Sequence, residues 1–296
     1  MGAARPGWAP EVALRVELHT FRTPDSKYMP KGEGLWVCAK RYSTEDSVKD
    51  TKGLTLLFTH CIGSSKEEWD VVISSLFKFQ SSKDEPFRIR EAWSFDRQNH
   101  GDAAVLNSHA LFERKDVVTL YEWALALTSF VRSPILHGHR VVPVGHSSGT
   151  TAWMLTTTPF ARGAVPYTSM FLVESTITQE DVWKRELEER MAYMNLVVKL
   201  TLNRKDQWPS KEHALNYFSK RLPWNLWDSR ALESFVEHGL HDAADVRLGV
   251  ELKWTKEQEA ASYPDTIPHF VSAIQLAEIS DTIPIHIIWG ERIEFM

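Results

Sequence analysis

The sequence is poor in cysteine, in clustered positive charge and in long hydrophobic runs. It contains two cysteines, Cys38 and Cys61, which are too few for a disulfide framework, and no Cys/His spacing is typical of a zinc site. Its 34 basic and 39 acidic residues give a net charge of −5, and no basic stretch is suited to neutralising phosphates. We therefore expect an intracellular chain with reduced thiols, no metal, no cofactor and no nucleic-acid partner.

Targeting and membrane signals are also missing. No apolar run approaches the length needed to span a bilayer, so no transmembrane segment is predicted. Residues 1–7 lack the apolar core of a signal peptide, and residues 293–296 do not form a peroxisomal address of the Ser-Lys-Leu type. From the sequence alone, the cytosol is the expected location.

The chain does contain a regular alternation of strand and helix patterns. Short apolar runs predict strands covered on both faces, and apolar residues at helical spacing predict the helices between them. The predicted strands are 14–21, 35–42, 54–59, 88–95, 141–144, 170–173 and 285–289, and the predicted helices are 66–79, 113–131 and 148–157. The first two strands instead alternate apolar with polar residues, which is the pattern of an antiparallel hairpin. The fold class is therefore α/β with a mostly parallel sheet.

One short motif gives this alternation a chemical meaning. The pentapeptide Gly-His-Ser-Ser-Gly at residues 145–149 follows a predicted strand and leads into a predicted helix. A Gly-x-Ser-x-Gly turn in that context is the nucleophile elbow of α/β-hydrolases, and its glycines allow backbone segments to approach closely. The motif predicts an α/β-hydrolase fold in which Ser147 is the nucleophile of a serine hydrolase.

The segment 178–244 departs from the alternation. It is rich in charge and shows helical patterns with no strand pattern between them, and we expect most of its tryptophans to pack it onto the sheet. By analogy with the fold, we assign it as a helical cap over the serine. The predicted organisation is a first core part of residues 1–177, a cap of residues 178–244 and a C-terminal core part of residues 245–296.

Serine hydrolysis also requires donors for the oxyanion and an acid that orients the base. The predicted donors are the backbone N–H of Ser148, directly after the nucleophile, and that of Ile62, in the loop after the third strand. His60 in the same loop is expected to pin the backbone rather than to act as a base. Two acids are candidates: Glu174 ends the sixth predicted strand and is favoured, and Glu294 follows the seventh and is the alternative.

The catalytic base has no clear candidate. In this fold it is a histidine on a loop after an eighth strand, whereas this sequence ends a few residues past the seventh strand, 285–289. His100 and His146 are near the motifs but not at the position of a base. We expect a truncated or degenerate copy, a base supplied in an unusual way, or a tail replaced by a partner chain. The chain would then lack the eighth strand, and the exposed edge of the seventh could support a homo-oligomer.

Three stretches carry a wider resemblance. They are residues 59–69 (THCIGSSKEEW), 96–103 (DRQNHGDA) and 252–263 (LKWTKEQEAASY). Together they resemble a fungal group of α/β-hydrolases that includes the yeast peroxisomal lipase and the hydrolases of AK-toxin and AF-toxin biosynthesis, and the similarity covers nearly the whole chain.

This resemblance implies a more specific function. The chain would be a serine esterase, lipase-like enzyme or thioesterase that hydrolyses the ester or thioester of a medium- or long-chain acyl group. Its partner would be a small apolar acyl substrate, and its setting fungal secondary metabolism, in the biosynthesis of a host-selective toxin in the peroxisome. If the base is absent, the alternative is a non-catalytic or degenerate binding protein that keeps the fold and its pocket.

Overall fold

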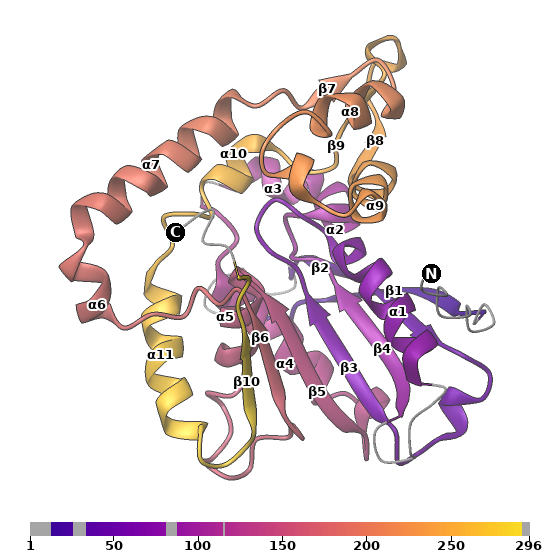
Figure 1. Ribbon diagram of the computed structural model, residues 1–296, viewed down its shortest axis with the longest axis vertical. Coiled ribbons are helices and arrows are strands. Elements are labelled where there is room, and N and C mark those ends of the chain that lie inside the picture. Colours follow the sequence, from indigo (N-terminus) through magenta and orange to yellow (C-terminus); the bar gives the residue numbers. More distant parts are fainter. Residues whose placement is uncertain (1–12, 26–33, 81–87, 115, 292–296) are drawn as a thin grey trace, which may run out of the picture.

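The computed structural model describes residues 13–25, 34–80, 88–114 and 116–291, and its centre is a twisted sheet (Figure 1). The strands are β1 (Arg15–Arg22), β2 (Trp36–Ser43), β3 (Leu54–Thr59), β4 (Ile89–Phe95), β5 (Arg140–His146), β6 (Met170–Val173) and β10 (Ile285–Ile288). They lie in the order β1-β2-β4-β3-β5-β6-β10. β1 and β2 pair antiparallel, β2 joins β4 antiparallel, and the pairs from β4 to β10 are parallel. The predicted fold class is confirmed.

Helices cover both faces of this sheet. They are α1 (Asp70–Gln80), α2 (Gly101–Leu106), α3 (Ser108–Glu113), α4 (Leu120–Val131), α5 (Ser148–Leu155), α10 (Lys256–Ala260) and α11 (Ile267–Ile279). Leu57 packs on one face in a cluster with Trp123 of α4. Its neighbours Leu56 and Phe58 pack on the other face with Phe77 of α1. Because side chains alternate along a strand, burial on both faces explains why the β3 sequence is nearly continuously apolar.

One predicted helix, 113–131, is wrong in its extent. In the structure α3 ends at Glu113 and α4 begins at Leu120. Thr119 accepts the backbone N–H of Glu122 and the Glu122 side chain accepts that of Thr119, which is a capping box. This motif fixes the start of a helix, and the periodicity of the apolar residues did not reveal it.

The segment 178–244 also differs from the expectation of helices without strands. Its helices are α6 (Glu180–Arg185), α7 (Leu187–Asn203), α8 (Lys211–Phe218) and α9 (Ser229–Gly239). It also contains β7 (Gln207–Trp208) and β8 (Leu240–Asp242), which pair with β9 (Val250–Leu252) in a separate small sheet. Strands of two or three residues are too short to show an alternation of apolar and polar residues.

This small sheet has an apolar cluster of its own. Trp208, Phe218 and Phe235 pack there with Trp254, which follows β9. Figure 1 shows β7, β8 and β9 grouped with α8 and α9 beyond one end of the main sheet. In the same view α6 and α7 lie at the left, on the side of α11. Among the described helices, none is long and apolar enough to cross a bilayer.

β10 forms the edge of the main sheet within the described residues. It pairs with β6, and its Ile287 and Ile288 are each 48% exposed. An apolar edge of this kind can pair with another chain. Homo-oligomerisation through the edge stays a prediction.

Candidate active site

Ser147 lies in the turn between β5 and α5 with φ 52° and ψ −121°. A positive φ at a residue other than glycine costs on the order of 1–3 kcal/mol. The flanking glycines are required: a Cβ on Gly145 would lie 2.6 Å from the Gly149 oxygen, and one on Gly149 would lie 2.7 Å from the Thr59 oxygen. The Ser147 N–H donates to the Val173 oxygen at 2.9 Å. The turn therefore has the strained strand–turn–helix geometry that the motif predicts.

The surroundings of Ser147 leave its hydroxyl available. The side chain is half-buried, and no hydrogen bond holds its hydroxyl within the described ranges. The carbonyl oxygen of Ser147 accepts from the hydroxyls of Thr150 and Thr176 at 2.6 and 3.2 Å. Ser148 is the first residue of α5, where backbone N–H groups have no partner within the helix. Its N–H is therefore free to bind an anion, as an oxyanion donor must be.

Glu174 lies beside this turn, directly after β6. It has φ 46° and is the second described residue other than glycine with a positive φ. Its N–H donates to the Ile288 oxygen at 2.9 Å, and its carboxylate accepts the N–H of Gly290. The carboxylate therefore bridges the ends of β6 and β10, and no histidine hydrogen-bonds to it in the described part of the chain. Glu294, the alternative acid, lies outside the described residues.

The loop that contains Ile62 is pinned by His60, as predicted. The Nδ1 of His60 is 2.6 Å from the Cys61 oxygen, and its Nε2 accepts the N–H of Arg97 at 3.0 Å. Burial of the ring lowers its pKa to about 4, so the neutral ring donates at Nδ1 and accepts at Nε2. Both nitrogens are used structurally, and His60 is not placed as a base.

His100 holds the same loop from the other side. Its Nε2 accepts the N–H of Gly63 at 3.1 Å, and its Nδ1 is 2.8 Å from the Asn99 side-chain oxygen. Burial lowers the pKa of His100 well below its usual range. The ring is therefore a neutral positioning group for the loop, which excludes one of the two histidines that the sequence left open as a base.

The three stretches that carry the sequence resemblance meet at this loop. Gly63 has φ +76°, and a Cβ there would lie 2.8 Å from the Glu259 carboxylate. Glu259 is itself held by Arg204 at 2.6 Å. The Asn99 side chain donates to Gln258 at 3.1 Å. The three stretches therefore contact one another and together hold the loop around Ile62 in place. The sequence did not indicate that they meet.

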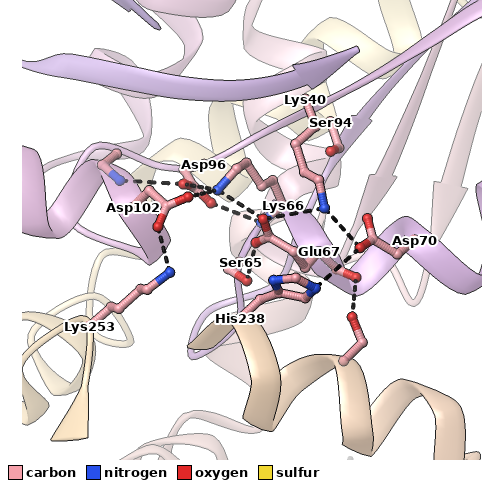
Figure 2. Close-up of polar contacts among 12 residues, drawn as sticks. Lys40, Ser65, Lys66, Glu67, Asp70, Ser94, Asp96, Asp102, His238 and Lys253 are labelled. Carbon is pink, nitrogen blue, oxygen red and sulfur yellow. Dashed lines mark hydrogen bonds and ion pairs between the residues drawn. The ribbon is translucent and has the colours of Figure 1, made fainter. Parts of the chain in front are cut away.

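A buried ion network fixes the residues that follow the loop. The Lys66 ammonium lies 3.0 Å from Glu67, 3.1 Å from Asp96 and 2.6 Å from Asp102. Although burial lowers the pKa of Lys66, the three carboxylates outweigh it and raise the pKa. Lys253 pairs with Asp102 at 2.5 Å. Figure 2 shows Lys66 between these carboxylates, with Lys253 reaching Asp102 from the other side.

Helix α9 joins the same network from the segment 178–244. The Ser234 hydroxyl donates to the Glu67 carbonyl at 3.3 Å. His238 lies 3.9 Å from Asp70, as Figure 2 shows. Lys40 of β2 also pairs with Asp70 at 2.9 Å. The network therefore connects the sheet, the loop after β3 and α9.

Glu68 connects the loop to the serine turn, and sequence analysis missed it. One of its oxygens lies 2.6 Å from the Nδ1 of His146, and the other accepts the N–H and the S–H of Cys61 at 3.2 and 3.3 Å. Burial raises the pKa of Glu68, but His146 outweighs it and lowers the pKa to about 2. Burial lowers the pKa of His146, and Glu68 raises it. His146 is thus held in an ion pair, which disfavours the neutral ring that a base requires.

The other histidines are also separate from the Ser147 hydroxyl. His269 of α11 is partly buried, and its Nδ1 lies 2.7 Å from the Thr151 hydroxyl of α5. The remaining histidines after Ser147 are His213 on α8, His238 on α9, His241 on β8 and His286 on β10. No described histidine hydrogen-bonds to the Ser147 hydroxyl.

The lowered pKa of His269 leads to a pH prediction. Burial lowers the pKa of His269 from 6.5 to about 4, so below pH 6.5 the unfolded chain binds a proton that the folded chain does not. We expect the free energy of unfolding to fall from pH 6.5 to about 4, by up to about 1.4 kcal/mol per pH unit for this residue. Urea unfolding of wild type and His269→Gln across this range measures the slope. Equal slopes for the two proteins would contradict the prediction.

The sheet order, the strained serine turn and the loop after β3 together define an α/β-hydrolase. Residues 56–291 match the alpha/beta hydrolase family, and the chain belongs to this family. A comparison with curated protein sequences gives no significant match.

Solved structures show the same fold. The peroxisomal α/β-hydrolase Lpx1 of Saccharomyces cerevisiae has a TM-score of 0.69 at 15% identity, over 95% of this chain and 76% of that chain. The thioesterase domain of the curacin biosynthetic pathway has a TM-score of 0.56 at 12% identity, over 96% and 85%. An esterase of M. tuberculosis has a TM-score of 0.53 at 15% identity, over 94% and 85%. At these identities the similarity concerns the fold.

Proposed function

We propose that the protein is a serine hydrolase that acts on the ester or thioester of an apolar acyl group. The observation that carries the proposal is the backbone of Ser147, held at φ 52° between two glycines that cannot bear a Cβ. Strain of this kind is retained where it supports function. The Ser147 hydroxyl attacks the acyl carbonyl, and the N–H groups of Ser148 and Ile62 stabilise the oxyanion. Glu174 is the proposed acid.

The segment 178–244 supports an apolar substrate. On α7, Leu196 and Leu200 are 51% and 61% exposed, and exposed apolar side chains of this kind are suited to contact with an acyl chain. We propose that this segment is the cap of the enzyme, that β9 pairs with its strands as part of the cap, and that the core consists of 1–177 and the rest of 245–296. The esterase and the thioesterase domain among the similar folds are consistent with acyl chemistry. The fungal, toxin-related and peroxisomal setting rests on the sequence resemblance.

One observation favours the alternative of a non-catalytic binding protein. Within the described residues, no imidazole contacts the Ser147 hydroxyl, and His100 and His146 are both engaged elsewhere. Without a base, the oxyanion donors and substrate binding give only modest catalysis. Such a protein would bind acyl esters without hydrolysing them.

Covalent labelling distinguishes the two functions. A fluorophosphonate probe reacts with an activated serine hydroxyl, so we expect stoichiometric labelling of the wild type and none of Ser147→Ala. Ser280→Ala, at an exposed position after α11, is the matched control and should label fully. Intact mass spectrometry measures the adduct, and p-nitrophenyl esters of increasing chain length measure turnover. Binding of such an ester without labelling or turnover would instead support the binding protein.

A further inference from the structure

Cys61, Glu68 and His146 form a cluster of three different metal-binding groups beside the serine turn. The thiol sulfur, a carboxylate oxygen and an imidazole nitrogen all lie within 4.8 Å of one another. We infer that this cluster is a binding site for a zinc-class transition metal ion, and that the ion inhibits the site at Ser147. The inference departs from the sequence-based expectation of no metal.

The donor set selects the class of ion. A thiolate, an imidazole and a carboxylate are all ligands that Zn²⁺ accepts, whereas Mg²⁺ and Ca²⁺ prefer sites made of oxygen alone. Three protein ligands leave a fourth tetrahedral position for water. The three side chains are each partly exposed, so the ion can enter from solvent.

Glu68 already holds the cluster in a shape close to a metal site. Its Oε1 lies 2.6 Å from His146 Nδ1, and its Oε2 lies 3.3 Å from Cys61 Sγ. Around a tetrahedral zinc with bonds of about 2.0–2.3 Å, neighbouring ligand atoms are separated by roughly 3.3–3.8 Å. The two pairs that include Glu68 therefore need to separate by about an ångström at most, and since all three ligand atoms lie within 4.8 Å of one another, the third pair needs to change by roughly 1.5 Å at most. The bound ion replaces the thiol proton and the proton between Glu68 and His146, and both protons pass to solvent.

The position of the cluster explains why occupancy would inhibit. Cys61 directly precedes Ile62, and His146 directly precedes Ser147. An ion bound to both side chains would tie the loop after β3 to the serine turn and shift one against the other. Catalytic groups must be held within a fraction of an ångström, and a misplacement of about 1 Å can cost 10²-fold in rate. This inhibitory effect rests on the proposed hydrolase function, whereas the metal site itself does not.

Direct metal binding tests the site without reference to activity. The chelator-treated full chain is titrated with Zn²⁺ by calorimetry and with Cd²⁺ by ultraviolet absorbance, where a cadmium–thiolate bond gives a charge-transfer band. We expect one equivalent of either ion and the thiolate band in the wild type. Cys61→Ser should lose the band and bind Zn²⁺ at least about 10- to 100-fold more weakly. Replacing a residue that only hydrogen-bonds to a metal ligand already weakens metal affinity by that factor, and Cys61 is a direct ligand.

Two further variants make the result specific. Cys38→Ser removes the other cysteine, which is buried in β2, and should keep both the band and the affinity. His146→Gln should keep the thiol but weaken Zn²⁺ binding, and circular dichroism verifies that each variant is folded. Absence of Zn²⁺ binding by the wild type, or unchanged affinity in folded Cys61→Ser, would overturn the metal site.

Inhibition is measured separately. Zn²⁺ should slow fluorophosphonate labelling of the wild type at concentrations that occupy the site, and excess chelator should restore the rate. Labelling unaffected by bound Zn²⁺ would refute the inhibitory role and leave the site in place. Metal binding without labelling in any condition would refute the hydrolase function instead, so the two failures are distinguishable.

Discussion

Replacing Ser147 by glycine is expected to abolish hydrolysis and, at the same time, to raise the free energy of unfolding. The hydroxyl is the proposed nucleophile, so its loss should lower turnover by at least about 10³-fold. The stability gain has a separate cause, since φ 52° and ψ −121° are readily adopted only by glycine. Relief of the backbone strain stabilises the variant, and the greater entropy of glycine in the unfolded chain offsets part of this gain. The free energy of unfolding should therefore rise by roughly 0.5–2 kcal/mol.

Ser147→Ala is the matched variant that separates the two effects. Alanine also lacks the hydroxyl but keeps the Cβ, so it should lose the same activity without the gain in stability. Urea unfolding of the three proteins and hydrolysis of p-nitrophenyl esters give the comparison. A glycine variant that is less stable than the alanine variant would show that the turn is not strained, and the principal support for the nucleophile would be lost.

Replacing Lys66 by methionine is expected to cause the largest loss of stability. Lys66 is 1% exposed and its ammonium contacts Glu67, Asp96 and Asp102. Methionine fills a similar volume but leaves these carboxylates without their common cation. Removal of one partner from a buried ion pair costs about 3–5 kcal/mol, because an uncompensated charge remains in the interior.

Two comparisons identify the cause of that loss. Lys49→Met removes a lysine that is 64% exposed in its pairs with Glu45 and Asp46, and it should cost about 1 kcal/mol or less. The double variant Lys66→Met, Asp96→Asn should recover part of the single loss, since one of the unpaired charges is then gone. Denaturant unfolding measures all of them. If the double variant is at least as unstable as the sum of its single changes, uncompensated charge is not the cause.

The sequence by itself determined the elements that depend on local patterns. Each main-sheet strand was predicted to within a few residues, because β1 and β2 alternate apolar with polar residues and the other strands are short apolar runs. The serine turn at residues 145–149 could also be predicted from local sequence, because the strand, the two glycines and the helix that form it are contiguous. Two predictions failed: a single helix over 113–131, and a segment 178–244 without strands. The first failed at the N-terminal capping box of α4 and the second at strands of two or three residues, and the periodicity of apolar residues reveals neither feature.

Only the tertiary structure decided how the candidate site is supported. Asn99 contacts Gln258 across 159 positions of sequence, and Glu68 contacts His146 across 78. Nothing in the spacing of these residues indicates that they meet, because crossovers between parallel strands bring them to the same end of the sheet. The sequence therefore specified which chemical groups the chain carries and the turn that presents Ser147. The fold specified which of those groups lie together, because burial and ion pairing act between segments that are distant along the chain.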